Sequence, residues 1–398
     1  MLKKNAILKN KKVRYSLYGI FFILTILLLT ATFGYQFYLK PNVGKVKNQI
    51  ENFVSSETGG QVNIENLNIA WHLTNPRFQI RNFSITDREN NKTINLKAVD
   101  FELSWLSLLK LKPVLTEIII GDLNALIERL PDESFKIAGI SVKESSNSNF
   151  SDWLLNQRNI KIINAKILWR DHYRNAEDLV FSNINFHYHS PTYLAYLDRH
   201  KFNISTKIST GSKNRVNVSG YFDLDSISQI NSLESMLNVS FSEANLSAFK
   251  QWVDYPTDIK EGYGDLKLQL SINKLSINKV KTIFNVKNFV GNFNKNNDKY
   301  IDINQLSGSA LYSNKNDEIK LTTTNLNLVS NNINLKNSAF EVITKDNQPE
   351  QFKVKLNELN IDAAEHILAQ TPFFEEIKSE LNKANPSGLI KNFQLSWI

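Results

Sequence analysis

The sequence predicts a mainly β protein. We expect an N-terminal transmembrane helix, then one long, curled antiparallel β-sheet that forms an elongated groove or trough, with a few short helices. Three observations lead to this fold class. Residues 17–39 contain no charged side chain. From residue 61 onward, apolar and polar residues alternate in short runs, as in strands that bury one face. No segment shows the strand and long-helix rhythm of a parallel α/β enzyme.

The uncharged stretch 17–39 is long enough to cross a membrane. As a helix it would reach roughly 35 Å, against about 30 Å of hydrocarbon. Six basic residues and no acid precede it, which predicts a cytoplasmic basic stub at 1–16 and export of everything after Lys40. A buried core helix rarely stays uncharged for so long, and residues 30–34 make a poor signal-peptide cleavage site. The expected anchor residues are Leu17, Ile20, Phe22, Leu24, Leu27, Leu29 and Phe33.

Composition narrows the possible functions. The net charge is +8, but six positive charges lie in the stub, so the exported part is close to neutral. The basic total therefore does not indicate nucleic-acid binding. The chain has no cysteine, which excludes thiol nucleophiles and thiolate metal ligands and fits an oxidising compartment reached without disulfides.

Residues 40–145 are expected to form a first β segment that begins with a helix next to the membrane. Pro41 ends the anchor, and apolar residues at helical spacing between Val43 and Ser55 predict an amphipathic helix that Gly59 and Gly60 stop. The apolar period then changes to two. A one-residue slip at Glu65–Asn66 predicts a bulge in the first strand.

Residues 146–398 are expected to form a second, groove-shaped β segment. The alternation continues almost to the end, including a strand at Ile390–Trp397. Three helical interruptions are predicted: Phe150–Gln157 with Ser151 as its cap, Ser247–Tyr255, and Ala363–Lys383, which Pro372 breaks.

So many strands with one apolar face must cover that face by closing into a barrel, pairing two sheets, or curling one sheet into a trough. Roughly twenty strands at ~4.8 Å spacing would span about 100 Å, and open sheets of that size curl. A trough with its apolar side inward suits acyl chains. The expected lining is the apolar phase of the clearest strands: Phe101, Leu103, Leu266, Leu268, Leu270, Ile272, Phe352 and Val354.

Residues that could carry chemistry are few. His187 and His189 share one face of a strand, with His172, Asp171 and His200 not far away, so a metal site is conceivable, although a solvated strand face is the favoured interpretation. The sequence has no nucleophile elbow, phosphate-binding glycine loop or dinucleotide fingerprint. The six tryptophans are interpreted as core or groove lining. We therefore predict no catalytic residue, no cofactor site and no metal site.

Several blocks resemble a known family. The stretch 58–67 (TGGQVNIENL), followed by Trp71, 76–80 and 83–85, resembles the start of AsmA-like envelope proteins. The blocks WLLNQ at 153–157, AKILWRD at 165–171, RHKF at 199–202 and PSGLI at 386–390 resemble landmarks of the YhdP-type branch. The resemblance covers essentially the whole chain.

The resemblance implies a non-enzymatic protein anchored in the inner membrane, with its bulk in the periplasm and a long β-sheet groove related to chorein-type bridge proteins. It implies phospholipid transport between the inner and outer membranes, which supports outer-membrane integrity. The implied partners are membrane phospholipid, the inner membrane and other envelope proteins, with no nucleic acid. YhdP-type members are far longer, so we expect an N-terminal part of a longer protein or a shortened member.

Two other functions stay open at this point. An anchored scaffold could assist assembly of outer-membrane proteins and lipids through exposed strand edges. In that case the sheet should close tightly on its own side chains. An envelope hydrolase would instead need a polar constellation in a pocket.

Overall fold

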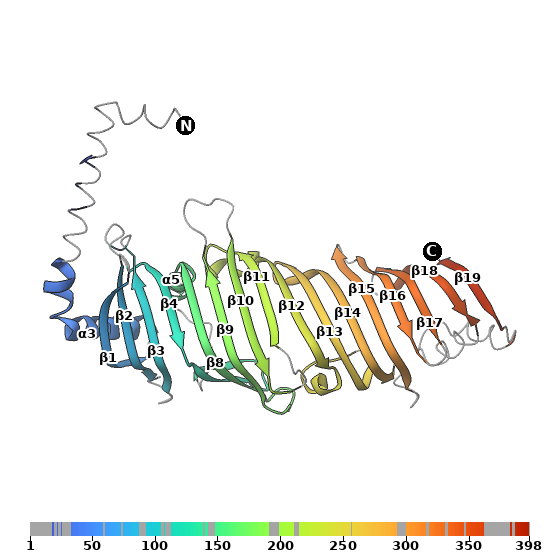
Figure 1. Cartoon of the computed structure of the whole chain (residues 1–398), viewed down its shortest axis with the longest axis horizontal. Helices are drawn as coiled ribbons and strands as arrows, with labels where there is room; N and C mark the ends of the chain where they lie inside the picture. Colours follow the sequence, from blue (N-terminus) through green and yellow to red (C-terminus); the bar gives the residue numbers. More distant parts are fainter. Residues whose placement is uncertain are drawn as a thin grey trace, which may run out of the picture.

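The structure is a computed structural model (Figure 1). It describes residues 18, 19, 22, 25, 33–58, 60–72, 75–86, 93–104, 107, 113–137, 140–141, 148–190, 199–210, 215–255, 257–292, 300–315, 318–330, 333–345, 348–361, 383 and 387–397.

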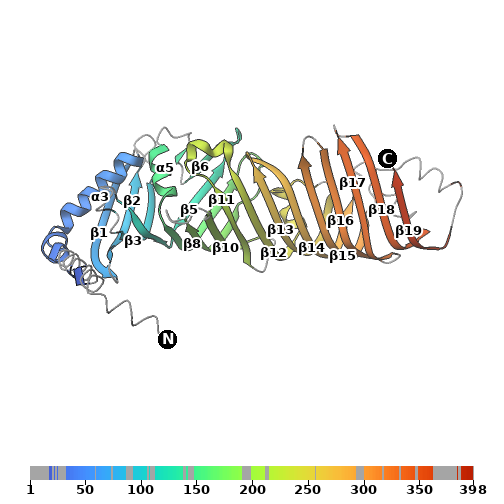
Figure 2. The same cartoon turned by 90° about the horizontal axis from the view of Figure 1, so that it is seen from above.

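Most described residues lie in one 19-stranded sheet that extends along the long axis of the molecule (Figures 1 and 2). Its first eleven strands are β1 (Gln61–His72), β2 (Asn75–Thr86), β3 (Thr93–Leu103), β4 (Leu115–Gly121), β5 (Asn124–Arg129), β6 (Phe135–Ile137), β7 (Ile140–Ser141), β8 (Asn159–Asp171), β9 (Leu179–His189), β10 (His200–Ile208) and β11 (Arg215–Asp223). The others are β12 (Glu234–Asn245), β13 (Asp258–Asn273), β14 (Ser276–Asn292), β15 (Ile301–Lys315), β16 (Glu318–Val329), β17 (Asn334–Lys345), β18 (Gln348–Asn360) and β19 (Leu389–Trp397).

Short helices accompany the sheet. They are the π-helix η1 (Gly34–Leu39), α3 (Val43–Thr58), α5 (Ser148–Leu155) and the 3₁₀-helices η2 (Ile227–Ser232) and η3 (Ser247–Gln251). The predicted helices after the anchor and near Trp153 are confirmed, although α5 begins at Ser148, so the predicted capping position Ser151 lies inside it. The predicted helix Ser247–Tyr255 is present as the shorter 3₁₀-helix η3. The predicted helix Ala363–Lys383 lies outside the described residues, apart from Lys383 itself.

Consecutive strands pair antiparallel from β1 to β4 and from β8 to β19. The prediction of a wholly antiparallel sheet is wrong at one place: β4 and then β5 pair parallel with β8. After β5 the chain leaves through β6 and β7, and α5 carries it back to the start of β8. A crossover of this length is what parallel pairing requires.

A crease runs along the sheet and bends its strands into a trough. It consists of residues with left-handed φ angles of 49° to 56° in or between the strands: Asn82, Asp122, Asn164, Asn183, Glu243, Asn288, Asn325, Asn337 and Asn392. Most are asparagine, the residue that adopts this conformation most readily after glycine. The bulge predicted at Glu65–Asn66 is wrong, because the register of β1 with β2 is the same on both sides of the Glu65–Asn82 position and neither strand has an extra residue. The left-handed Asn82 interrupts the ladder there instead, and the apolar phase of β1 changes at this point.

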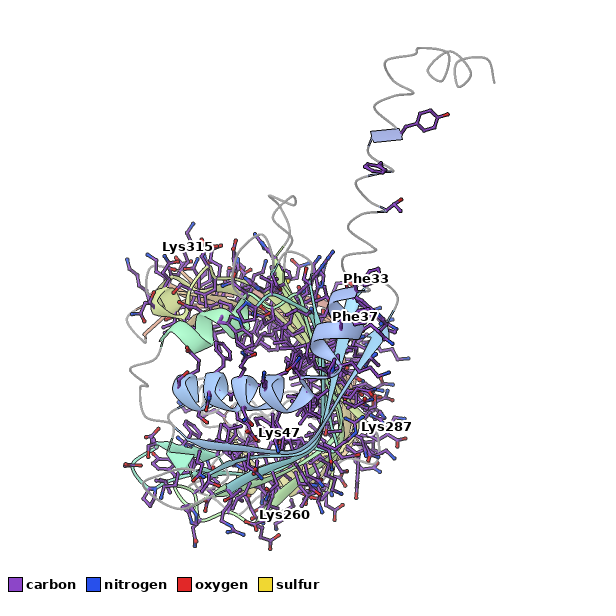
Figure 3. The ribbon with its side chains drawn as sticks, turned by 90° about the vertical axis from the view of Figure 1, so that its left-hand side faces the viewer. Phe33, Phe37, Lys47, Lys260, Lys287 and Lys315 are labelled. Atoms are coloured by element: carbon purple, nitrogen blue, oxygen red, sulfur yellow. The ribbon has the colours of Figure 1, made fainter. Side chains whose placement is uncertain are left out.

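Side chains from neighbouring strands stabilise the crease. The backbone N–H groups of Asn164, Glu243 and Asn337 donate to Asx side-chain oxygens of an adjacent strand, at 2.9 to 3.2 Å. These N–H groups lie where the regular ladder is interrupted, so the side chain replaces a lost strand partner. In the end-on view, Lys287, next to Asn288, lies at the bend, with Lys315 and Lys260 towards opposite rims (Figure 3).

The crease divides the trough into two wings. We call the part of each strand on the side of the Asn273–Ser276 hairpin the upper wing, and the part on the side of Asp258 the lower wing. Helix α3 lies inside the curve at the first end (Figure 3), where Ile50 and Val54 pack against the cluster of Val62 and Ile64.

Helix α3 also covers the free edge of β1. The amide of Val62 donates to Ser55 Oγ at 3.1 Å, and the amide of Ile64 donates to Glu51 Oε1 at 2.7 Å. These amides point away from β2 and would otherwise be open to another strand. The helix therefore blocks edge-to-edge pairing at this end of the sheet.

Because Asn288 has a left-handed φ angle, we predict that the free energy of unfolding depends on the type of residue at position 288. Asn288→Val places a β-branched residue in the left-handed region and should lower the free energy of unfolding by ~1–3 kcal/mol. Asn288→Gly should leave it unchanged or raise it. Urea denaturation of the full chain, with Asn203→Val on an ordinary exposed strand position as the control, measures both. Equal losses for the two valine variants would contradict a strained crease.

Candidate functional site: the inner face of the trough

The apolar phase of the strands faces the inside of the trough. In the upper wing, strand register aligns these residues in two rows that cross β12 to β18. One row is Leu237, Leu270, Val280, Tyr312, Leu321, Val342 and Phe352. The other is Val239, Leu268, Thr282, Ala310, Thr323, Phe340 and Val354. Seven strands at ~4.8 Å spacing give these rows a length of about 30 Å. We call the two rows the open lane.

Helix α5 roofs the upper wing over the strands before the lane. Trp153 Nε1 donates to Pro113 O at 3.1 Å, and the buried Gln157 side chain accepts from the Leu115 amide at 3.0 Å. On the other side, Asp152 accepts from Ser226 Oγ and the Ile227 amide, at 2.8 and 2.7 Å. Below α5 lies a cluster of Leu115, Ile118, Ile160 and Tyr188, so this section is filled by the protein's own side chains.

The segment that contains η3 roofs the lower wing. Trp252 Nε1 donates to Glu177 O at 3.2 Å, and Arg174 forms two bonds to the Asp254 carboxylate at 2.6 and 2.8 Å. Phe249 and Trp252 pack on the cluster of Leu179, Ile208 and Val216. Further along, Leu246 and Tyr255 pack on the cluster of Ile259, Phe289 and Ile303.

The open lane has no such roof in the part of the chain that the structure describes. Every residue of its two rows except Thr323 is only half-buried, and polar residues of the opposite phase, such as Lys267 and Gln269, are exposed. The lane is therefore an apolar strip that ordinary core packing leaves accessible.

The outer face of the same strands is polar. Lys320 and Lys353 bind the Glu341 carboxylate at 2.8 and 3.3 Å. The hydrogen bond from Lys320 holds the pKa of Glu341 below its ordinary value. A shallow hollow on this face is lined largely by amide, hydroxyl and lysine side chains, among them Asn217, Asn238 and Lys267. Ile283 also lines this hollow and is 52% exposed, but it pairs with Lys267 and Ser309 on the neighbouring strands, so it is not part of an apolar row like those of the lane.

The residues expected to line the groove separate into two groups. Leu266, Leu268, Leu270 and Ile272 lie side by side on β13, and Phe352 and Val354 lie at the β18 end of the lane. Phe101 and Leu103 lie in the roofed section: Phe101 stacks on Phe78 at 4.8 Å between ring centroids, and both pack on buried clusters. Sequence reasoning did not identify the lane residues on β12 and β14–β17, although their alternation carries the same signal.

The anchor prediction falls largely outside the described residues. Of its residues, Phe22 and Phe33 are described, and they are 65% and 59% exposed. Within the described part of the chain, the structure shows no helix long and apolar enough to cross a membrane.

The histidines are dispersed. His187 lies on the outer face near Lys161, His189 contacts Asn159, and His172 contacts Glu128 at 3.2 Å. His200 lies inside, where its Nδ1 is 2.6 Å from the Tyr188 hydroxyl. The described residues contain no group of three or more His, Asp or Glu side chains placed to hold a metal ion.

The two landmark blocks around α5 and β8 have structural roles. Gln157 of the WLLNQ block clamps α5 to β4. Asp171 of the AKILWRD block is buried and accepts from the Arg174 amide at 3.0 Å, which fixes the turn between β8 and β9. Both blocks thus hold the roofed section together.

Comparison with protein families gives a match over nearly the whole sequence. The model of the family described as "YhdP protein" matches residues 7–398. The chain belongs to the YhdP family. Membership of the YhdP family makes it an AsmA-like envelope protein, as the resemblance implied. Comparisons with curated proteins and with solved structures gave no match.

In this YhdP-family chain, we predict that the hydrogen bond between the Leu115 amide and Gln157 contributes measurably to the free energy of unfolding. Gln157→Leu removes the acceptor of the buried Leu115 amide and should lower the free energy of unfolding by ~1–3 kcal/mol. The matched control is Asn156→Leu, because Asn156 is exposed and bonds only within its own turn. Denaturant unfolding followed by tryptophan fluorescence measures the difference, and equal effects would contradict the clamp.

A pH dependence follows from the buried pair of Tyr188 and His200. Burial raises the pKa of Tyr188 to about 12 and lowers the pKa of His200 below 6.5, although Asp223 and Asp225 partly oppose the second shift. Because the unfolded chain binds a proton at His200 more readily than the folded chain does, protonation lowers the free energy of unfolding. The stabilisation that neutral, buried His200 provides is complete above pH 6.5 and is lost as the pH falls towards the folded pKa.

The variant that checks this pH dependence is His200→Phe. It should unfold with a smaller loss of stability on acidification than the unchanged protein. His187→Asn on the outer face is the control. The pKa of His187 is lowered as well, but His187 is exposed and His200 is buried, so this variant should reduce the loss less than His200→Phe does. Unchanged acid sensitivity in His200→Phe would contradict the assignment.

Proposed function

We propose that this protein is a non-enzymatic conduit that carries phospholipid between the inner and outer membranes and so supports outer-membrane integrity. The uncharged stretch 17–39 anchors it in the inner membrane, with the stub in the cytoplasm and the sheet in the periplasm. Acyl chains lie on the open lane, and the head group stays in water. The family membership supports an envelope role of this kind.

The observation that carries the proposal is the half-buried apolar lane over β12–β18. A scaffold whose sheet closed on its own packing would bury these residues, as α5 and the η3 segment do elsewhere. Here a sheet face some seven strands long stays uncovered in the described structure. Apolar surface of this extent marks a binding site.

The energetic role of such a lane is clear from the hydrophobic effect. Each CH₂ group that leaves an apolar environment for water costs ~0.8 kcal/mol, so exposing both chains of a phospholipid costs about 20 kcal/mol or more. A continuous apolar lane removes most of this barrier without any chemical step. The conduit therefore needs no catalytic residue and no cofactor of its own.

An anchored scaffold remains the second candidate, and one observation favours it. Among the described residues, β19 pairs with β18 alone, and Leu389 and Leu395 on it are 56% and 39% exposed. This edge offers main-chain groups for strand addition by an envelope protein, which the covered edge of β1 does not.

Photo-crosslinking in cells tests the conduit. A photoreactive amino acid at Leu268 should capture labelled phospholipid, whereas one at Lys267, the adjacent residue on the outer face, should capture little. Both variants must reach the membrane in equal amounts, which immunoblotting checks. Lipid captured at neither position, or equally at both, would argue against the conduit, and capture of a protein near β19 would favour the scaffold.

A further inference from the structure

We infer that, where the lane crosses β13–β15, acyl chains travel along the upper wing only, and that the lower wing of these three strands is core. This inference rests on the proposed conduit and deepens it. The trough then holds a one-sided lane bounded by the crease, with its entrance at the end of the α5 roof.

The lower wing is closed by its own packing. Ile259, Phe289 and Ile303 are 4%, 7% and 4% exposed, and they form one cluster with Leu246 and Tyr255 of the η3 segment. Lys250 of η3 binds Asp258 at 2.7 Å, and Asp258 also accepts from the Tyr300 hydroxyl at 2.6 Å. These bonds fasten the roof to the first residue of β13 and to the chain just before β15. A chain seated here would have to displace packed side chains.

The upper wing of the same three strands is different. Leu268, Leu270 and Val280 are half-buried, and so are Ala310 and Tyr312 on β15. The two halves of each of these strands therefore differ in the burial of their apolar side chains. Residues of identical apolar character are core on one side of the crease and accessible on the other.

The chemistry of the lane selects hydrocarbon as its occupant. The backbone N–H and C=O groups of β13, β14 and β15 are engaged in strand pairing on both sides. An extended polypeptide laid across the rows would find no partner for its own backbone groups there, at a cost for each buried unpaired group. An acyl chain has no such groups to satisfy.

The roofs also place the entrance. The α5 roof ends at η2, which Asp152 fastens through Ser226 and Ile227. The open lane begins on the next strand, at Leu237 and Val239. Ile227 and Ile230 of η2 are 39% and 38% exposed, so apolar side chains mark this boundary. Acyl chains therefore enter the lane from the side, past η2, because protein side chains fill the upper wing below α5.

Cysteine labelling tests the one-sided lane, because the chain has no cysteine of its own. Single variants Leu268→Cys and Val280→Cys report on the upper wing, and Ile259→Cys and Ile303→Cys report on the lower wing. Each full-length variant is reconstituted and treated with an uncharged fluorescent maleimide, before and after incubation with phosphatidylethanolamine and phosphatidylglycerol vesicles. Upper-wing cysteines should react at least tenfold faster than lower-wing ones. Vesicles should slow only the upper-wing reaction, by severalfold.

The outcomes separate the inference from the proposed function. Equal protection by vesicles on both wings would overturn the one-sided lane and leave the conduit standing. Protection on neither wing would overturn the conduit and the lane together. Trypsin resistance checks folding of each variant. If Ile303→Cys is misfolded, Ile259→Cys alone tests whether the lower wing is closed. Rapid labelling of a folded Ile259→Cys variant would show that the lower wing is accessible and would contradict the inference.

Discussion

A single sheet with one apolar face must hide that face from water, and this constraint shapes the whole molecule. Two packed sheets would hide it completely, but the described residues form one sheet. The crease allows the sheet to turn its apolar face towards itself, because left-handed residues bend successive strands within a few residues of the same register level. Strand pairing continues across the bend, since Asx side chains bind the amides that the bend releases. The trough is thus a property of the backbone.

Helix α5 and the η3 segment cover part of the apolar face that the crease turns inward, but not all of it. Helix α5 and the η3 segment are each fastened by a few polar bonds to distant parts of the chain, such as Asp152 to Ser226 and Arg174 to Asp254. These bonds hold aromatic side chains of α5 and η3 over the two wings, where they form ordinary core. Where both roofs end, the apolar face remains half-buried. The molecule is therefore a packed protein at one end and an open trough along much of its upper wing.

The sequence allowed much of the sheet to be predicted because alternation is a local signal. It assigned Leu266, Leu268 and Leu270 to one face, but their pairing with Leu237, Val239 and Val280 is known only from the structure. It did not separate groove lining from core, since Phe101 and Leu268 look alike until the roofs are known. Those roofs depend on contacts such as that of Trp252 with Glu177, 75 residues apart in sequence, which no local pattern reveals. The crease had a readable signal in Asn82, which interrupts the alternation between Ile80 and Phe83.

A half-buried lane is costly to keep, and its persistence argues for a function. Each lane residue, such as Leu270 or Val342, gives up part of the stabilisation that full burial would provide. A longer α5 or a second η3-like segment would recover that stabilisation, because the same apolar rows continue beyond both roofs. The roofs do not extend over the lane in the described structure, although the neighbouring sections show that the fold can accommodate them. Acyl chains on this strip, as proposed above, would supply the burial that the roofs supply elsewhere.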